Sequence, residues 1–488
     1  MAQPITPIPK LQLTITMLIQ AAESLSATVI FPFVPQFVQD TGVTGGDERK
    51  IGYWAGVLES VFFVAEFASV YAWGRVSDHI GRRPVLLLGP LGLAFSLIGF
   101  GWSTTFSGLF IFRCAQGVFN GNIGVVKTVM AEFSDATNLA QTLSLIPIAW
   151  SSGTTLGPII GGLLSNPQER WPNTFGKLQI LRYHPYLLPC AAIGLLSLSF
   201  FFLALIGLKE SSPVILARNK KEKLRAAASA EPTSITGLLA DETTGYGAMV
   251  RSDVAEAVET PSSSRELATS ADEELPTIRE LLVPRLVIPL LNYGFYCFLS
   301  TAYQVLFPLM YSTSIPNGGL GFNPYQIGVT RGVWGVLNTL FLLFIAARLI
   351  RRFGVRNIYI FSFANFAICL GAYPLLNILA RRAQRVDALV WAVVVVQGIS
   401  NITLSWSYAT VQMYIVNSAP QPSALSSTNS IAQMTATILR ALAPFLVSSL
   451  FAASLEWNVA GGYVVYIILL CVVAMGIYSS FLLAKESS

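Results

Sequence analysis

Long apolar windows, separated by charged residues or by glycine and proline, recur along the whole chain. A helix that crosses a bilayer needs about 20 mostly apolar residues. Windows of about that length occur six times before Lys209 and six times after the polar stretch that follows it. The expected spans lie near residues 11–38, 53–72, 85–102, 106–131, 140–164 and 186–207, and then near 285–311, 324–347, 358–378, 388–414, 425–452 and 461–484. The pattern predicts an all-α membrane protein with twelve transmembrane helices in two six-helix bundles.

The composition supports lipid as the main solvent of the chain. Of its 488 residues, 53% are hydrophobic and 12% are charged, whereas ordinary soluble domains carry roughly 25% charged residues. The formal net charge is +5, and the basic residues outside the central polar stretch lie largely in short loops between the windows. That placement is typical of positive-inside anchoring rather than of nucleic-acid binding. We therefore expect the chain to contact a lipid bilayer and no nucleic acid.

The stretch between the two groups of windows differs in composition from both. Residues 209–284 are rich in Ser, Thr, Ala, Glu and Asp and hold few large apolar side chains. Such a segment cannot bury enough apolar surface to offset the entropy lost on ordering it, so we expect a disordered cytoplasmic linker. The predicted organisation is a first six-helix bundle at 1–208, the linker at 209–284 and a second six-helix bundle at 285–488.

The basic loops also predict the orientation of the chain. Arginines follow the second and eighth windows, and a Lys- and Arg-rich stretch opens the linker. All three lie on the cytoplasmic side if both termini are cytoplasmic, whereas the loop with Arg381, Arg382 and Arg385 does not follow this rule. We expect a multi-pass protein of the plasma membrane or a vacuolar membrane, with cytoplasmic termini and no removable signal peptide.

Neither a cofactor nor a metal site is expected. All five cysteines fall inside apolar windows without a CxxC pair, and the chain has two histidines, His79 and His184. We interpret the cysteines as packing residues. No nucleophile–base arrangement or phosphate-binding loop stands out, and the polar residues are dispersed over many windows, so an enzyme is not expected.

The two groups of windows repeat short sequence features in the same order. Four pairs recur at separations of 276, 276, 273 and 286 residues. They are Phe31-Pro32 with Phe307-Pro308, Ile51-Gly52 with Ile327-Gly328, Gly81-Arg82-Arg83 with Gly354-Val355-Arg356, and Gly157-Pro158 with Ala443-Pro444. One such coincidence carries no weight. Four in order indicate duplication of a six-helix unit, which is how many secondary transporters are built.

Ionisable residues inside the windows are the main candidates for function, because a charge is costly in lipid. Glu23 lies near the middle of the first window and Arg113 lies in the fourth. Burial raises the proton affinity of a carboxylate and a nearby cation lowers it, so an arginine that moves could switch Glu23 between two protonation states. We interpret Glu23 and Arg113 as a proton-coupling pair. The alternative is a static ion pair that fixes helix packing.

Further charges are candidates for lining a substrate cavity. Glu59 and Glu66 lie seven residues apart and therefore share one face of the second helix. Arg440, midway along the eleventh window, has no obvious acidic partner in its own half. It would face an anionic substrate group or an acid across the cavity. Lys127, toward the end of the fourth window, is interpreted as a residue that extends its ammonium group to the membrane interface.

A compact polar turn at 73–84 separates the second and third windows. Its chemistry is carried by Gly74, Asp78, Gly81, Arg82 and Arg83. Glycine permits a tight reversal, the aspartate can cap or pair, and the arginines stay on the cytoplasmic side. We predict that this turn is a hinge in a conformational change. The alternative is a positively charged anchor for two helices.

The fifth window combines small residues with a proline. Glycines at four-residue spacing form a smooth face that allows close helix approach, and a proline inside a helix removes one hydrogen bond. Both features predict a helix that moves or bends during gating. The candidate residues are Gly153, Gly157, Pro158, Gly161 and Gly162.

Together these motifs resemble the major facilitator superfamily over the whole chain apart from the linker. Gly74-x-x-x-Asp78-x-x-Gly81-Arg82-Arg83 is similar to its signature between helices 2 and 3, Arg113-x-x-Gln116-Gly117 to its helix 4 motif, and Gly153-x-x-x-Gly157-Pro158-x-x-Gly161-Gly162 to its helix 5 motif of antiporters. The resemblance implies alternating access by two bundles, a cytoplasmic latch at the turn, and proton coupling through a membrane-embedded acid and Arg113. It adds Gln116 to the candidates for the substrate cavity.

The turn also resembles that of the zinc-induced-facilitator-like branch, close to drug:proton antiporters. Three departures argue against a zinc-related substrate: His79 replaces the usual basic residue, no cysteine precedes Cys114, and the linker is acidic and lacks histidine. In the second half, Arg351 aligns with Asp78. We therefore expect only the first half to carry the full latch.

The sequence thus predicts a secondary active transporter that moves a small organic solute across a membrane by alternating access, in antiport with protons. Export from the cell and loading of a vacuole both fit this prediction. We expect a monomer whose partners are the solute, protons and the lipid bilayer. Two alternatives remain, a proton-independent facilitator with the same fold and a transporter-like nutrient sensor that uses the linker as its output.

Overall fold

The computed structural model shows an all-helical chain. It describes residues 9–134, 138, 142, 145–212, 215–218, 222, 284–418 and 425–484. Helices joined by turns make up these residues, without a strand among them. Most of the expected linker at 209–284 and most of the beginning of the expected fifth span lie outside the described residues.

The first half of the chain contains five long helices and several short ones. The α-helices are α1 Lys10–Thr28, α2 Val34–Asp40, α3 Ile51–Ile80, α4 Arg82–Trp102, α5 Phe106–Asn120, α6 Ile123–Glu132, α8 Ile146–Leu164, α9 Pro167–Arg170, α10 Gln179–Tyr183 and α11 Leu187–Gly207. The fourth expected span, 106–131, is therefore two consecutive helices, α5 and α6, with a break at Gly121 and Asn122.

The second half repeats the arrangement with longer helices. They are α16 Pro284–Ser312, α17 Pro324–Phe341, a π-helical turn at Leu342–Ala346, α18 Ala347–Phe353, α19 Val355–Ala383, α20 Ala388–Asn417, α21 Leu425–Glu456 and α22 Val464–Phe481. Polar side chains from the loops between the apolar windows cap the N-termini of several helices. The Asp387 carboxylate accepts from Val390 N (3.1 Å) at the start of α20, and Asn323 and Gln326 form a reciprocal capping box at the start of α17.

Ten helices in the described part of the chain are long and apolar enough to cross a membrane. The first and fifth expected spans correspond to α1 and α8, which are 19 residues each but rich in hydroxyl and small residues. These two helices pack against each other. Ser24 Oγ donates to Ala149 O (3.3 Å) and Thr28 Oγ1 donates to Gly153 O (3.1 Å). The polar groups of α1 therefore face protein rather than lipid.

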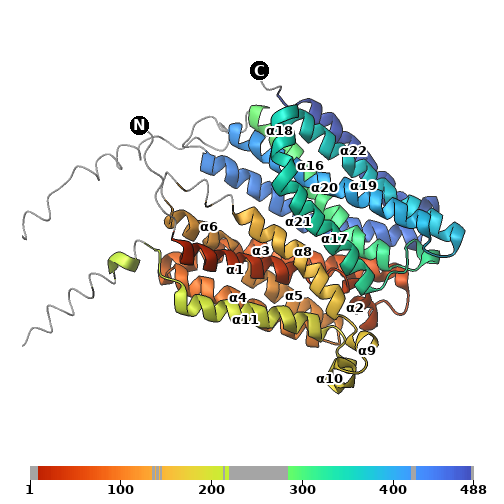
Figure 1. Ribbon diagram of the computed structural model, residues 1–488, viewed down its shortest axis with the longest axis horizontal. Coiled ribbons are helices and arrows are strands. Elements are labelled where there is room, and N and C mark those ends of the chain that lie inside the picture. The colour runs from red at the N-terminus through yellow and green to blue at the C-terminus, as the bar shows by residue number, and fades with distance from the viewer. Residues whose placement is uncertain are drawn as a thin grey trace, which may run out of the picture.

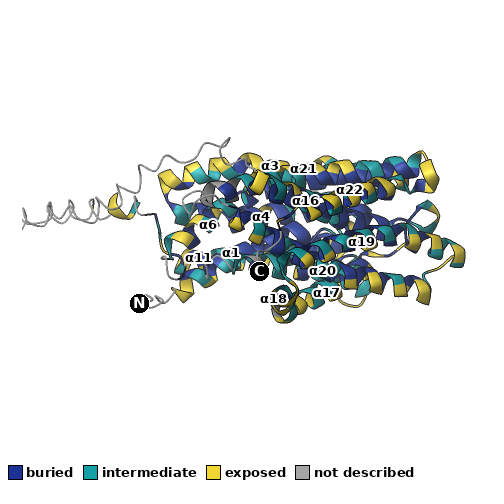
Figure 2. Ribbon diagram, turned by 90° about the horizontal axis from the view of Figure 1, so that it is seen from above, coloured by how far each residue is buried: buried dark blue, intermediate teal, exposed yellow. Residues whose placement is uncertain are grey.

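The helices form two bundles, as Figure 1 shows, with α1 to α11 in one and α16 to α22 in the other. Two pairs of helices make the main contacts between the bundles, α3 with α21 and α8 with α17. Most buried residues lie along the inner faces of the helices, and the exposed ones cover the outside and the ends (Figure 2). Large apolar side chains on the outside of these helices fit a lipid-facing surface.

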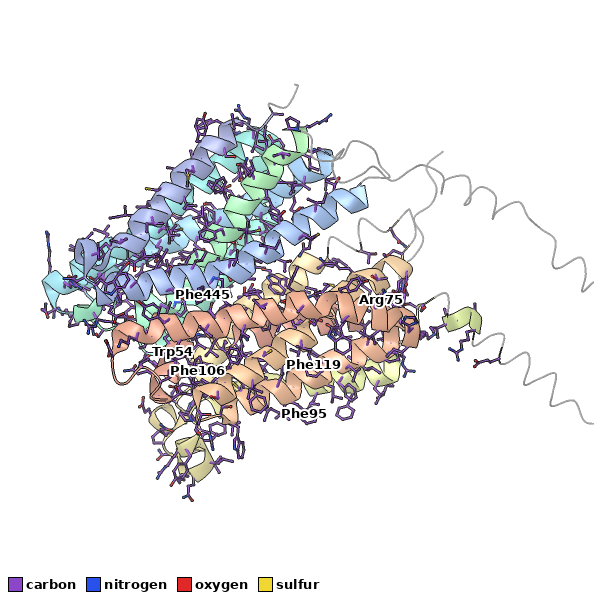
Figure 3. The ribbon with its side chains drawn as sticks, turned by 180° about the vertical axis from the view of Figure 1, so that it is seen from behind. Trp54, Arg75, Phe95, Phe106, Phe119 and Phe445 are labelled. Carbon is purple, nitrogen blue, oxygen red and sulfur yellow. The ribbon has the colours of Figure 1, made fainter. Side chains whose placement is uncertain are left out.

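The bundles touch closely at the end opposite the 73–84 turn. A Cβ on Gly162 would lie 2.8 Å from Gly328 Cα, and one on Gly56 would lie 3.0 Å from Pro444 O. Glycine lets backbones approach this closely because it has no side chain. Figure 3 shows α3 and α21 side by side, diverging toward the end near Arg75. The bundles are therefore closed at one end of the molecule and farther apart at the end that carries the turn.

Candidate functional site

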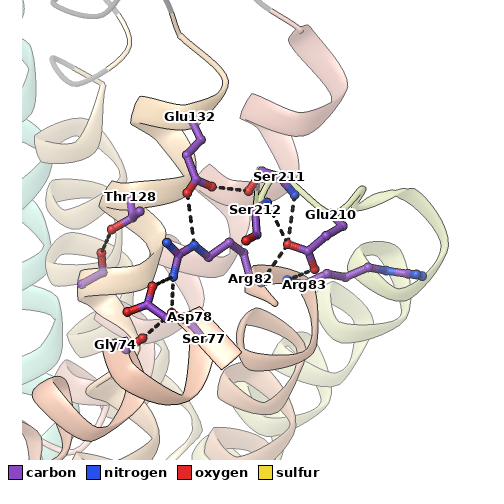
Figure 4. Close-up of polar contacts among 11 residues, drawn as sticks. Gly74, Ser77, Asp78, Arg82, Arg83, Thr128, Glu132, Glu210, Ser211 and Ser212 are labelled. Carbon is purple, nitrogen blue, oxygen red and sulfur yellow. Dashed lines mark hydrogen bonds and ion pairs between the residues drawn. The ribbon is translucent and has the colours of Figure 1, made fainter. Parts of the chain in front are cut away.

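The turn between α3 and α4 is built around a glycine with positive φ. Gly81 has φ 102° and ψ 163°, a conformation that only glycine adopts readily. Arg82 then begins α4 and points back toward the end of α3 (Figure 4). Its Nη1 donates to Asp78 Oδ1 (2.6 Å) and to Ser77 Oγ (2.6 Å). The chain thus reverses at Gly81 and Asp78 pairs with Arg82, while the role of both residues in gating stays a prediction.

Two acids extend this turn into a network with other helices, as Figure 4 shows. Arg82 Nε donates to Glu132 Oε1 (3.2 Å) at the end of α6. The Glu210 carboxylate, just after α11, accepts from the backbone N–H groups of Arg82 (2.8 Å) and Arg83 (3.1 Å). A carboxylate at this position satisfies free N–H groups at the N-terminus of α4 and complements the helix dipole.

Sequence reasoning missed Glu132 and Glu210, because their partners lie far away in the sequence. Glu210 and Arg82 are separated by 128 residues. One signal was present in the sequence: Lys209-Glu210-Ser211-Ser212 recurs as residues 485–488, at the same offset of 276 as two of the other repeated features. The second copy lies outside the described residues.

In this conformation the described polar contacts of the turn all lie within the first bundle. The Asp78 side chain is 63% exposed, and a Cβ on Gly74 would meet nothing within 4 Å. Arg83 Nη2 donates to Leu205 O (2.7 Å) at the end of α11. The latch between bundles that the resemblance implies is thus not engaged here, and its role stays a prediction.

The predicted gating residues of α8 contact both α1 and the second bundle. A Cβ on Gly153, Gly157 or Gly161 would collide with Ser24, Thr28 or Val29 of the α1 segment, respectively. Gly162 instead faces Gly328 of α17, and Pro158 O lies 2.5 Å from where a Cβ on Gly328 would be. The motif therefore brings α8 close to two neighbours at once.

Arg113 is 1% exposed and is held by neutral groups. Its Nη1 donates to Gln116 Oε1 (2.7 Å), its Nη2 donates to Ala27 O (3.2 Å), and its guanidinium lies 4.3 Å from the centroid of the Phe62 ring. Glu59 of α3 is a further buried charge and is 4% exposed. Gln116 is fully buried behind Arg113, so in this conformation it positions the arginine rather than lining an open surface.

Glu23 is fully buried and does not contact Arg113 in the described structure. Gln20 Nε2 donates to Glu23 Oε2 (2.9 Å), while Glu23 Oε1 has no hydrogen-bond partner among the described residues. The two members of the predicted proton-coupling pair thus lie in separate environments, and the coupling role of each stays a prediction.

Three further charges of the expected spans, Glu66 of α3, Lys127 of α6 and Arg440 of α21, are partly buried. The ion pairs found among the described residues do not join them. The interpretation of Lys127 as a membrane-interface residue therefore stays a prediction, and so do the two alternatives for Arg440, an anionic substrate group and an acid across the cavity.

Three tyrosines of the second bundle, Tyr293, Tyr296 and Tyr408, lie against one another. The Tyr408 ring lies between the other two, with ring centroids 6.3 Å from Tyr293 and 5.9 Å from Tyr296. They supply flat apolar surfaces within the second bundle.

The described residues contain no group of three or more His, Cys, Asp or Glu side chains that could hold a metal ion. Cys190, Cys297 and Cys369 are buried and Cys114 is partly buried, as expected for packing residues, whereas Cys471 is exposed on α22.

Comparison with known proteins agrees with this geometry. The chain matches the Major Facilitator Superfamily over residues 16–444. It is 32% identical to the major facilitator-type transporter psiT2 of Psilocybe cyanescens, over 98% of this chain and 91% of that protein. The efflux pump azaK of Aspergillus niger is 28% identical over 92% of this chain and 83% of its own length.

The matching proteins also include a member of the zinc-induced-facilitator-like branch. Zinc induced facilitator-like 1 of Arabidopsis thaliana is 25% identical over 94% of this chain and 88% of its own length. The crystal structure of a D-xylose-proton symporter superimposes with a TM-score of 0.66 at 15% identity, over 98% of this chain and 99% of that one. The match over most of the chain and the two-bundle fold lead to one conclusion: the chain belongs to the Major Facilitator Superfamily and is a membrane transporter, not an enzyme.

Proposed function

We propose that this secondary transporter exchanges protons for a small organic solute, which it removes from the cytoplasm. The observation that carries the proposal is Glu23, a fully buried carboxyl group with one oxygen unpartnered and no ion pair among the described residues. A carboxyl group in such a place is costly to bury and marks a functional site by default. Proton binding and release is the chemistry that a lone carboxyl group can perform.

Alternating access supplies the second part of the mechanism. The bundles pack through glycines at one end and are farther apart at the end with the Asp78 turn. Rocking of one bundle against the other would expose the buried charges of the spans, Glu23 among them, to each side of the membrane in turn. In the proposed orientation, the turn and both termini are cytoplasmic, and this conformation opens toward the cytoplasm.

Proton exchange then follows from the arrangement of acids. A proton that enters from the opposite side neutralises Glu23, and its release to the cytoplasm leaves a carboxylate for the solute to engage. Arg113 takes part through its contact with the α1 helix that carries Glu23, where it donates to Ala27 O (3.2 Å). The similarity to the efflux pump azaK supports export as the direction of transport.

The same proposal covers the organisation of the protein. The bundles at 1–208 and 285–488 work as one monomeric unit, joined by the cytoplasmic segment 209–284. The plasma membrane and a vacuolar membrane are both compatible with removal of a solute from the cytoplasm.

Proteoliposomes with a trapped pH-sensitive dye test the proposal. A panel of organic cations, anions and zwitterions is added under an imposed pH gradient, and solute-dependent proton movement is recorded. Glu23→Gln should abolish proton movement but retain solute binding, since glutamine keeps the shape and cannot take up the proton. The matched control is Glu169→Gln, an exposed acid in α9, which should behave as the unmodified protein.

Two outcomes would contradict the proposal. Solute flux that is insensitive to the pH gradient would select a proton-independent facilitator. Full proton movement in the Glu23→Gln protein would assign coupling to another group.

A further inference from the structure

At the closed end of the molecule, opposite the 73–84 turn, polar side chains reach from one bundle to the other. Glu48 lies in a short 3₁₀ turn just before α3, and its Oε2 accepts from Ser314 Oγ (2.7 Å) and Asn317 Nδ2 (3.1 Å) of the second bundle. Tyr53 OH of α3 donates to Glu456 Oε2 at the end of α21 (3.2 Å). Each bundle thus contributes one carboxylate, which accepts from neutral donors of the other bundle.

The second bundle holds the partner of Glu48 in place. Ser314 and Asn317 belong to the tight turn between α16 and α17. The backbone of this turn is bound by α19, because Asn377 Nδ2 donates to Ile315 O (3.1 Å) and Arg381 Nη2 donates to Pro316 O (2.9 Å). The carbonyl groups of the turn therefore face α19, while two of its side chains remain to bind Glu48.

The first bundle leaves Glu48 free for this contact. Its two neighbours, Asp47 and Arg49, pair with each other at 3.0 Å. The other ion pairs found among the described residues also lie before residue 285, so none of them joins the two bundles. The closed end is thus held by carboxylates that accept from neutral groups, and such charge-assisted hydrogen bonds are stronger than neutral ones.

Glu48 and Asp78 lie at opposite ends of one continuous helix. The 3₁₀ turn with Glu48 leads directly into α3, which has 30 residues and no proline and is about 45 Å long at 1.5 Å per residue. Near Glu48, α3 lies against α21, where a Cβ on Gly52 or Gly56 would collide with Ser448. Figure 3 shows α3 from Trp54, near the closed end, to Arg75, near the turn.

The two acids are in opposite states in this conformation. Glu48 is bound to the second bundle, whereas the Asp78 side chain is 63% exposed and its described contact is with Arg82 of the same bundle. When one bundle rocks against the other, a straight helix that leaves the second bundle at one end approaches it at the other. A bound Glu48 and an Asp78 bound to the second bundle therefore exclude each other.

We propose that Glu48 is a gating residue: its carboxylate must leave Ser314 and Asn317 before the closed end opens, and α3 then brings Asp78 to the second bundle. Glu48 does not touch the solute in this assignment and acts by setting which end of the molecule is open. The inference rests on the alternating access of the proposed function and is independent of proton exchange and of the identity of the solute.

Distances between spin labels on the purified full-length protein in lipid nanodiscs test the proposal. Double electron–electron resonance gives the distribution of distances across each end of the molecule. The labels are placed on exposed residues, one in each bundle, in a protein in which the more accessible cysteines are replaced by serine. The closed end carries Lys177→Cys with Arg385→Cys, the turn end carries Lys209→Cys with Asn357→Cys, and the background is Cys114→Ser with Cys471→Ser.

Removal of the Glu48 side chain should open the closed end. In Glu48→Ala the ratio of long to short distances there should rise about tenfold, the effect of losing hydrogen bonds to a charged group. Glu48→Gln should give a smaller rise, because its amide oxygen still accepts but carries no charge. Glu169→Ala is the matched control: Glu169 is an exposed acid at the same end of the first bundle, and its loss should leave the ratio unchanged.

Two combinations separate gating from a general loss of stability. The pair Ser314→Ala and Asn317→Ala should open the closed end as Glu48→Ala does, and adding Glu48→Ala to that pair should add no further opening, because the same contact is already lost. Asp78→Asn should favour the short distances at the closed end instead. The double variant Glu48→Ala, Asp78→Asn should return both distributions toward those of the unmodified protein.

Each outcome supports or overturns a stated part of the inference. An unchanged closed-end ratio in Glu48→Ala, or fully additive effects with the pair Ser314→Ala and Asn317→Ala, would overturn Glu48 as a gating residue. If Glu48→Ala does not fold, that pair makes the same test from the other bundle. Opening of the closed end without shorter distances at the turn end would overturn the coupling through α3. If these shifts occur in a protein that moves no protons, the gate stands and the antiport fails.

Discussion

The turn of the first bundle and its counterpart in the second have the same backbone but different chemistry. Gly81 has φ 102° and ψ 163°, and Gly354 has φ 80° and ψ 155°. Each turn is followed by an arginine that donates to a carbonyl at the end of the last helix of its bundle, Arg83 to Leu205 O (2.7 Å) and Arg356 to Phe481 O (2.6 Å).

The difference lies in the acids. The first turn joins Asp78, Arg82, Glu132 and Glu210 in one network, whereas Arg351 occupies the position of Asp78 in the second. The two turns share the glycine, the bond of its N–H to the last turn of the preceding helix, and the arginine–carbonyl contact. Among the described residues the acids belong to the first turn, and we therefore expect that turn to exchange partners during a conformational change.

Substitution of the two glycines should have the largest effect and should separate backbone from side-chain contributions. Gly354→Ala forces an alanine into a left-handed region, which costs about 1–3 kcal/mol. Gly81→Ala carries the same cost and in addition places a Cβ 2.5 Å from Glu210 Oε2, so it should destabilise more. Denaturant unfolding of the purified protein in detergent measures both. Equal losses of stability at the two glycines would show that the acids add nothing to the first turn.

Removal of the Arg82 side chain should come next. Arg82→Gln loses the contacts to Asp78, Ser77 and Glu132 and leaves a largely buried carboxylate, Glu132, without its cation; a loss of about 1–3 kcal/mol is expected. Transport in proteoliposomes should slow by about tenfold or more, since each 1.4 kcal/mol in a barrier is tenfold in rate. Arg351→Gln is the control at the counterpart turn and should change neither quantity.

Removal of the Glu210 carboxylate should cost about 1 kcal/mol, the usual value of an N-terminal cap. Glu210→Ala loses four acceptor contacts to the backbone N–H groups of Arg82, Arg83, Ser211 and Ser212. Thermal unfolding compares it with Glu486→Ala, at the repeated Lys-Glu-Ser-Ser sequence. An equal loss of stability in Glu486→Ala would show that a carboxylate also caps the second turn. An unchanged stability in Glu210→Ala would show that Glu210 does not stabilise the first turn.

The smallest effect on stability should come from Asp78→Asn. The Asp78 side chain is 63% exposed, and an exposed ion pair contributes about 0–1 kcal/mol. Transport should nevertheless fall, because the predicted latch between the bundles uses the Asp78 carboxylate in a conformation other than this one. Unfolding and transport are measured on the same preparation, and unchanged transport would leave Asp78 as a simple anchor.

The sequence predicted the turn well and the buried charges less well. Gly81 and Asp78 lie within a few residues of their partners, so local spacing was informative. Arg113 and Glu23 were predicted to pair because both are charges in the membrane. Their observed contacts, Gln116 and Ala27 for Arg113 and Gln20 for Glu23, depend on how each helix is rotated, and the sequence alone does not give that rotation.

Two polar helices also could not be explained from the sequence alone. The first and fifth spans were predicted from their position in the series, although α1 and α8 are less apolar than the others. The contact between the two helices explains their hydroxyl and glycine residues, because these residues face the neighbouring helix rather than lipid.

By itself, the sequence determined the solvent, the helices, the duplication and the turn, because hydrophobic length, glycine conformation and short-range spacing act locally along the chain. Only the tertiary structure decided which groups surround each buried charge and which end of the molecule is closed. These features arise from the packing of helices distant in sequence, where a rotation of one helix exchanges one partner for another.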